Sequence, residues 1–174
     1  MVVRGVGARR TDLAAGPLPA TECPRITAAF LDVNTGAAAT GNAEITAVGD
    51  QTIHTTNGLS GVTGSLRVAG LGTGTARVES GGSQLLEIDY PELMQANRDG
   101  RITIGNAAAL GHSLIKGRSQ DIFARSITVQ GGSGAGSDAK LDATTTQNIS
   151  TLKGGISVTG GAGGKASLDP TDQV

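Results

Sequence analysis

The chain contains few aromatic residues: they make up 2% of its 174 residues, and tryptophan is absent. A core without aromatic rings relies on Ala, Val, Ile and Leu, so we expect it to be thin and flat-layered. A single cysteine, Cys23, excludes an internal disulfide and a cysteine-based zinc site. The net charge of −1 gives no electrostatic reason to bind nucleic acid or an anionic membrane.

Long hydrophobic runs are also missing. No segment approaches the roughly 18 consecutive apolar residues of a transmembrane helix, and residues 1–25 lack the continuous apolar stretch of a signal peptide. We therefore expect no membrane insertion. Glycine, in contrast, is abundant, with 28 residues, or about twice its average usage.

Five copies of one pattern account for most of the chain. Each copy has an aliphatic-x-aliphatic triplet, a Gly/Ala/Ser-rich bend, a small-x-aliphatic triplet, a spacer and a glutamine. The first triplets begin at Leu31, Leu66, Ile102, Ile127 and Ile156; the second begin at Ala43, Ala76, His112, Ala139 and Ala166; the glutamines are Gln51, Gln84, Gln120, Gln147 and Gln173. Copy three, with His112-x-Leu114 as its second triplet, is degenerate.

These triplets alternate with period two, which is typical of short strands rather than helices. Glycine-rich segments such as GGSGAGSDA favour bends because glycine has poor helix propensity. The pattern predicts an all-β chain folded as a right-handed parallel β-helix of about five turns, with three short strands in each turn. At a strand spacing of ~4.8 Å the stack is about 24 Å tall.

The aligned glutamines have two explanations that the sequence leaves open. If they face inward, each amide donates to the next one and the column satisfies its own hydrogen bonds. If they mark a corner, their side chains bond to the backbone of the bends. Neither role is catalytic.

Charged residues at outward positions support the same alignment. Asp32 is expected to lie above Arg67, Glu44 above Arg77, and Asp138 beside Lys165. Opposite charges on neighbouring strands stabilise a sheet by only ~0.2–1 kcal/mol each. Three agreements nevertheless favour this register over a slipped one.

Two segments fall outside the repeat. Residues 1–29 are rich in Ala, Pro and Arg, so we expect an irregular segment or a cap before the β-helix domain of residues 30–174. Residues 85–100, LLEIDYPELMQANRDG, are expected to form an insertion between copies two and three, as a loop or a short helix.

Glycine-rich motifs resemble known binding loops without completing them. Gly131–Gly136 lacks the aspartate of a calcium-binding nonapeptide, and consecutive copies of the motif are absent. The Gly-x-Gly runs around Gly72 and Gly134 lack the P-loop lysine and the helix that follows it. Ser133 fails the pattern of a nucleophile elbow. We therefore predict no cofactor, no metal site and no catalytic nucleophile.

Parallel β-helices include many polysaccharide lyases and hydrolases, so acidic and histidine candidates need to be considered. Gly111-His112-Ser113 and Asn34-Thr35-Gly36 faintly resemble polygalacturonase motifs, but their order and partners differ, and His112 is expected at an inward position. Asp142 and Asp169 share an outward column, where neighbouring strands lie ~5 Å apart. That separation suits a retaining carboxylate pair, although no aromatic platform accompanies it. We predict no catalytic residue at either place.

The strings ITVQGGSGAGSDAKLDATTTQNI, ISVTGGAGGKASLD and GTARVESGGSQ resemble repeats of filamentous-haemagglutinin-like large exoproteins. These are bacterial two-partner-secretion adhesins built on long right-handed β-helices. The resemblance covers about residues 31–174 and implies an extracellular or cell-surface shaft that contacts a host surface or glycan. The family's signal peptide and amino-terminal secretion domain, with its Asn-Pro-Asn motif, are missing.

The sequence therefore predicts a non-enzymatic structural or adhesive shaft of a bacterial extracellular or cell-surface protein. The alternative is a carbohydrate-active β-helix enzyme. Copy five stops near Gln173 without a polar cap, and residues 1–29 make a poor lid, so unpaired strand edges are expected at both ends. Self-association through these open ends, head to tail into filaments, is the partner interaction that we predict.

Overall fold

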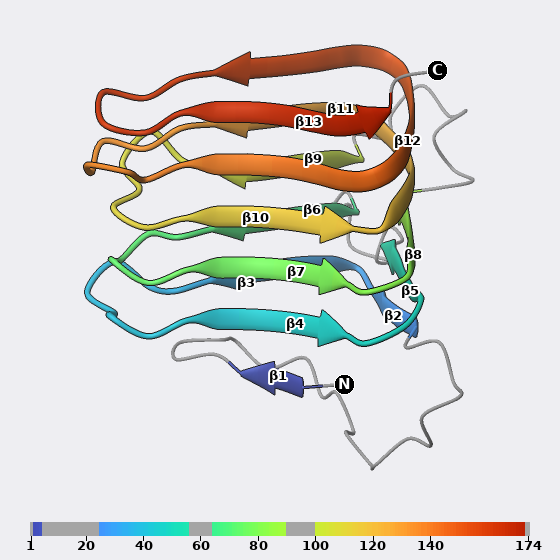
Figure 1. Ribbon diagram of the computed structural model, residues 1–174, viewed down its shortest axis with the longest axis horizontal. Coiled ribbons are helices and arrows are strands. Elements are labelled where there is room, and N and C mark those ends of the chain that lie inside the picture. Colours follow the sequence, from blue (N-terminus) through green and yellow to red (C-terminus); the bar gives the residue numbers. More distant parts are fainter. Residues whose placement is uncertain (1, 5–24, 56–63, 90–99, 173–174) are drawn as a thin grey trace.

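A computed structural model describes residues 2–4, 25–55, 64–89 and 100–172 (Figure 1). All regular secondary-structure elements within these ranges are strands, which confirms an all-β fold for this part of the chain. The strands are β1 (Val2–Arg4), β2 (Arg25–Ala28), β3 (Phe30–Asn34), β4 (Ala43–Ala47), β5 (Gln51–Thr55), β6 (Ser65–Ala69), β7 (Ala76–Ser80), β8 (Ser83–Ile88), β9 (Arg101–Gly105), β10 (Ser113–Gly117), β11 (Ser119–Gln130), β12 (Ala139–Thr159) and β13 (Ala166–Asp172).

Apart from β1, which pairs antiparallel with β4, the strands pair in parallel and form one curled sheet. The front ladder of Figure 1 contains β4, β7, β10, the first part of β12, and β13. The back ladder contains β3, β6, β9, and the last parts of β11 and β12. The side ladder contains β2, β5, β8, the first part of β11 and the middle part of β12. This arrangement is consistent with a β-solenoid.

Residues that the repeat alignment made equivalent are paired between neighbouring strands. The observed columns include Leu31–Leu66–Ile102–Ile127–Ile156, Ala43–Ala76–Ser113–Ala139–Ala166 and Gln51–Gln84–Gln120–Gln147. The first triplets are therefore placed as predicted in all five copies. Because side chains alternate along a strand, one residue of register decides which set is buried.

The core consists of these inward columns, packed between the front and back ladders. Its buried hydrophobic side chains are aliphatic, with isoleucine the commonest of the large ones. A flat layer of this kind needs side chains that repeat in every turn, and β-branched residues pack well on such a pleated surface. The prediction of a thin core without aromatic rings is confirmed for the described residues.

Glycine-rich bends allow successive turns to stack backbone on backbone. A Cβ added to Gly161 would lie 2.1 Å from the carbonyl oxygen of Gly132, and one on Gly72 would lie 2.0 Å from that of Ala39. A side chain cannot fit at these distances. A Cβ added to Gly160, in contrast, would have the carbonyl oxygen of Gly164 as its nearest neighbour, 3.8 Å away. Close stacking therefore requires glycine at particular bend positions.

The prediction for copy three is wrong by one residue in its second triplet. The front ladder pairs Ser113, not His112, with Ala76 and Ala139. Ser113 and Ile115 are buried, whereas His112 is exposed. The cause is a shorter corner: Arg118 alone connects β10 to β11, where two glycines connect β7 to β8. The alignment assumed an unchanged spacing between this triplet and the glutamine, and it therefore placed the triplet one residue too early.

The two segments outside the repeat are partly described. Residues 85–88, which we expected to begin an insertion, are the end of β8 and pair with β5. Residues 90–99 lie outside the described ranges. Within residues 1–29, β1 pairs antiparallel with β4 and β2 pairs parallel with β5. Residues 5–24 lie outside the described ranges.

Candidate functional site

The acidic pair that the sequence singled out lies on the outer face of the front ladder. Asp142 and Asp169 are direct neighbours in β12 and β13, as predicted. The ammonium of Lys140 lies 3.2 Å from the carboxylate of Asp169. A hydrogen bond from Ser167, followed by one from Lys140, lowers the pKa of Asp169 below its ordinary value. The general acid of a glycosidase needs a raised pKa, so Asp169 is poorly suited to that role.

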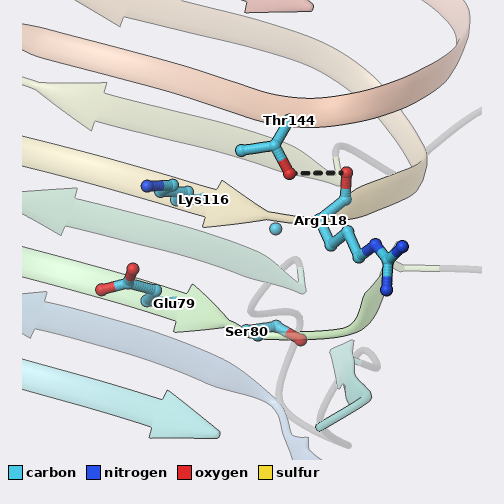
Figure 2. Close-up of a pocket in the computed structure, with 7 residues that line it drawn as sticks. Glu79, Ser80, Lys116, Arg118 and Thr144 are labelled. Atoms are coloured by element: carbon cyan, nitrogen blue, oxygen red, sulfur yellow. Dashed lines mark hydrogen bonds between the residues drawn. The ribbon is translucent and has the colours of Figure 1, made fainter. Parts of the chain in front are cut away.

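A column of alternating charge continues this face toward the N-terminus. Lys116 is the neighbour of both Glu79 and Asp142 in the front ladder. A shallow depression of about 290 Å³ lies beside it, lined by Glu79, Ser80, Gly81, Lys116, Gly117, Arg118 and Thr144 (Figure 2). Its charged side chains are of both signs, so its lining does not select a strongly anionic or cationic ligand.

The polar groups at the rim of this depression hold the corner together. Figure 2 shows the hydroxyl of Thr144 pointing at the carbonyl oxygen of Arg118, 3.3 Å away. The same oxygen accepts a hydrogen bond of 2.7 Å from the hydroxyl of Thr145. The guanidinium of Arg118 is directed away from Lys116. Thr144 and Thr145 therefore secure the short corner after β10.

The two polygalacturonase-like motifs do not come together as a catalytic group. His112 is exposed on the outer surface, which corrects its predicted inward position, and its carbonyl oxygen accepts a bond from the N–H of Ala76. The Oδ1 of Asn34 accepts the N–H of Gly36 at 3.0 Å. The hydroxyl of the buried Thr35 accepts the N–H of Gly72 at 2.9 Å. Asn34 and Thr35 thus cap a bend.

The glycine-rich loop of residues 131–136 is used for stacking between turns. The N–H of Gly132 donates to the carbonyl of Ser137, and that of Gly136 donates to the carbonyl of Gly163. The N–H of Ser133 donates to the carbonyl of Ala109 in the preceding turn. No group of three potential metal ligands occurs among the residues that the structure describes.

The glutamine side chains of the side ladder form a continuous column of hydrogen bonds, which we call the glutamine ladder. The amide nitrogen of Gln84 donates to Oε1 of Gln51 at 2.8 Å, Gln120 donates to Gln84 at 2.9 Å, and Gln147 donates to Gln120 at 2.6 Å. Gln51, Gln84 and Gln120 are each 1% exposed. The inward explanation is therefore confirmed, and the corner explanation is excluded for these residues.

The predicted outward pairs are present with one difference. Asp32 and Arg67 approach to 3.6 Å, and Glu44 and Arg77 to 3.2 Å. Asp138 accepts a hydrogen bond from the backbone N–H of Lys165 at 2.8 Å, so here the contact uses the main chain.

One contact between ionisable side chains was missed in the sequence although its signal was available. Nδ1 of His54 lies 3.4 Å from the carboxylate of Glu87 in the side ladder. Both residues follow a ladder glutamine by three positions, so the repeat alignment already placed them in one outward column. Their side chains are 15% and 21% exposed, respectively, and they add an interaction between turns one and two.

Comparison of the chain with protein-family models, curated proteins and solved structures gave no match. In the described ranges, a helix with the length and hydropathy to cross a bilayer is not found.

Proposed function

We propose that the chain is a non-enzymatic structural or adhesive shaft segment, built as a right-handed parallel β-helix of about five turns with three strands per turn. The observation that carries the proposal is the in-register pairing of five repeat copies in the back ladder. The right hand is supported by Figure 1, where front strands run to the right and back strands to the left as the chain rises.

The polar groups described above support a structural role. The buried glutamines bond to one another, and Asn34, Thr35, Thr144 and Thr145 bond to the backbone of bends and corners. Outward charges pair between turns at Asp32–Arg67 and Glu44–Arg77. A stack in which side-chain hydrogen bonds join neighbouring turns gains stability repeat by repeat.

The adhesive part of the proposal rests on the resemblance to filamentous-haemagglutinin-like exoproteins. The same resemblance is the basis for an extracellular or cell-surface location and for contact with a host surface or glycan. The proposal includes head-to-tail association of shafts through their ends into filaments.

A carbohydrate-active enzyme is the alternative, and the neighbouring Asp142 and Asp169 are the observation in its favour. The lowered pKa of Asp169 makes it unsuited to be the acid of such a pair, which must hold a proton near neutral pH. Its carboxylate is also 54% exposed and lies 3.2 Å from the ammonium of Lys140. We therefore favour the shaft.

Two measurements test the proposal. Incubation with a panel of acidic and neutral polysaccharides should release no reducing ends and no unsaturated products. Release that is lost in Asp142→Asn would overturn the non-enzymatic function. Duplication of the 29-residue copy that starts at Ile127 should give a folded chain, and small-angle scattering should show it longer by about 4.8 Å. An unfolded or unlengthened product would overturn the solenoid.

A further inference from the structure

The depression in Figure 2 coincides with the shortened corner after β10. Val78, Ile115 and Leu141 pair with one another in the front ladder, and each is followed by a member of the glutamine ladder. That glutamine follows Val78 and Leu141 by six positions, but it follows Ile115 by only five. The lining residues come from this corner and from the strands on both sides of it. The depression therefore lies where the chain is one residue shorter than in the neighbouring strands.

Two cationic side chains at this depression, Lys116 and Arg118, have no ion-pair partner among the residues that the structure describes. The register places Lys116 between Glu79 and Asp142, yet its ammonium pairs with neither carboxylate. The carboxylate of Glu79 is held by the guanidinium of Arg77 at 3.3 Å. Figure 2 shows Lys116 and Glu79 on one side of the depression and the guanidinium of Arg118 on the other. The depression thus offers a ligand two cationic donors and one oriented acceptor.

We propose that this depression binds a sugar unit that carries one carboxylate among its hydroxyls, as in an acidic polysaccharide. The guanidinium of Arg118 suits the carboxylate, because it can donate two parallel N–H bonds to it. A hydroxyl both donates and accepts, so the hydroxyls of the ring can accept from Lys116 and donate to Glu79. A uronate ring supplies both kinds of group. The inference rests on the proposed adhesive shaft and names a site and a ligand class for it.

The size and charge of the depression favour a sugar over an acidic peptide. Its volume of about 290 Å³ is at the lower limit of ligand sites, which span about 300–1,000 Å³, so it suits a single ring. It is shallow and lies on the outer surface, so a polysaccharide can continue beyond the bound ring. An acidic peptide would bring carboxylates without hydroxyls toward Glu79 and Asp142, and these like charges repel.

Nuclear magnetic resonance titration of the full ¹⁵N-labelled chain tests the site with matched probes. Methyl glucuronoside should shift the amide signals of Gly81, Gly117 and Arg118, and methyl glucoside, which lacks the carboxylate, should bind about tenfold more weakly. Arg118→Ala should abolish this preference, whereas Lys116→Met should weaken both sugars alike. Lys140→Met is the control, because Lys140 lies on the same face but outside the depression, paired with an aspartate at 3.2 Å; it should leave both affinities unchanged.

Three results would overturn the proposal: no shift with methyl glucuronoside, a preference for it that survives in Arg118→Ala, or equally tight binding of N-acetylglutamate amide, which carries one carboxylate without hydroxyls. A second variant tests the shortened corner itself. One glycine inserted between Gly117 and Arg118 gives this corner the two residues of the corner after β7, and it should abolish binding with unchanged β circular dichroism. These titrations are independent of the polysaccharide-release and duplication assays, so failure of the site and failure of the shaft are distinguishable.

Discussion

Replacing one glutamine in the middle of the ladder should be more destabilising than replacing all four described ones. In Gln120→Leu, the volume is nearly kept but two hydrogen bonds disappear: the one that Gln120 donates to Gln84 and the one that it accepts from Gln147. The variant leaves Oε1 of Gln84 and Nε2 of Gln147 without their partners.

The magnitude follows from the burial of those two groups. Gln84 is 1% exposed, and a buried acceptor without a partner costs about 1–3 kcal/mol. Gln147 is half-buried, so water partly replaces its lost acceptor. Its contribution to the loss of unfolding free energy therefore lies near the lower limit of about 1 kcal/mol. We expect Gln120→Leu to lower the free energy of unfolding by about 2–4 kcal/mol.

The fourfold variant removes donors and acceptors together. When Gln51, Gln84, Gln120 and Gln147 all become leucine, no amide in the described column is left unpaired, and apolar burial offsets the lost hydrogen bonds. Replacing both partners of a bond by apolar groups is nearly neutral, so we expect a change within about 1 kcal/mol. The four single effects should therefore be strongly non-additive.

Urea unfolding followed by far-ultraviolet circular dichroism measures these differences, with the slope checked for constancy. Gln130→Leu is the control, because Gln130 is half-buried and its amide donates only to backbone carbonyls of Gly131 and Gly160; its expected effect is below about 1 kcal/mol. A fourfold variant whose destabilisation equals the sum of the single ones would refute the ladder as the source of the stability.

Three further predictions concern the core, the bends and the front face. Leu141→Asp places a charge at a 0% exposed position and should unfold neighbouring turns, whereas Thr128→Asp on the outer face should barely change the melting curve; equal losses of β circular dichroism would contradict the assigned faces. Gly161→Ala should lower the melting temperature because its Cβ meets the Gly132 carbonyl, while the adjacent Gly160→Ala, with its nearest atom at 3.8 Å, should not; similar melting temperatures would contradict backbone stacking. Because the pKa of Asp169 is lowered in the folded chain, its contribution to stability is present above the ordinary aspartate pKa and is lost as pH falls through the lowered value; carboxyl-carbon NMR of Lys140→Met should show this pKa raised, and an unchanged pKa would exclude Lys140 as a cause.

The repeat alignment predicted most of the fold because its signals are periodic and reinforce one another. Leu31 and Val33 were placed inward by alternation, and Asp32 was placed opposite Arg67 by the same alignment. A slip of one residue would have buried the charge of Asp32, so the sequence itself argued against that register. Where several columns agree, the sequence alone is sufficient to place a strand.

The error at His112 shows where this information ends. One fewer residue at the corner of Arg118 shifts Ser113, rather than His112, into the inward column. Nothing in the composition of Gly117-Arg118 distinguishes a one-residue corner from the two-residue corner formed by Gly81 and Gly82. In the folded chain the Arg118 carbonyl accepts hydrogen bonds from Thr144 and Thr145 of the next turn, and these contacts across 26 and 27 residues of sequence are not visible in the local sequence.

The covering of the N-terminal end could not be predicted either, for a related physical reason. The antiparallel pairing of β1 with β4 lies outside the repeat and has no equivalent in any other turn. The Ala, Pro and Gly content of residues 1–29 indicated a poor lid there, and a strand of three residues has little tendency to form by itself. Pairing with a preformed edge supplies the hydrogen bonds that an isolated strand lacks. Such contacts depend on the folded stack, not on local sequence.

The near absence of aromatic residues and the proposed structural role have one common cause in the geometry of stacking. Turns ~4.8 Å apart require every inward column to accept a side chain of similar width in each turn. Isoleucine, leucine, valine and stacked glutamine amides meet that condition, and the described column of Gln51, Gln84, Gln120 and Gln147 shows that even its polar members bond along the axis. A polar side chain committed to its counterpart above and below is not available to a substrate. Uniform stacking thus accounts for the composition of the inward columns, and it agrees with the proposed shaft.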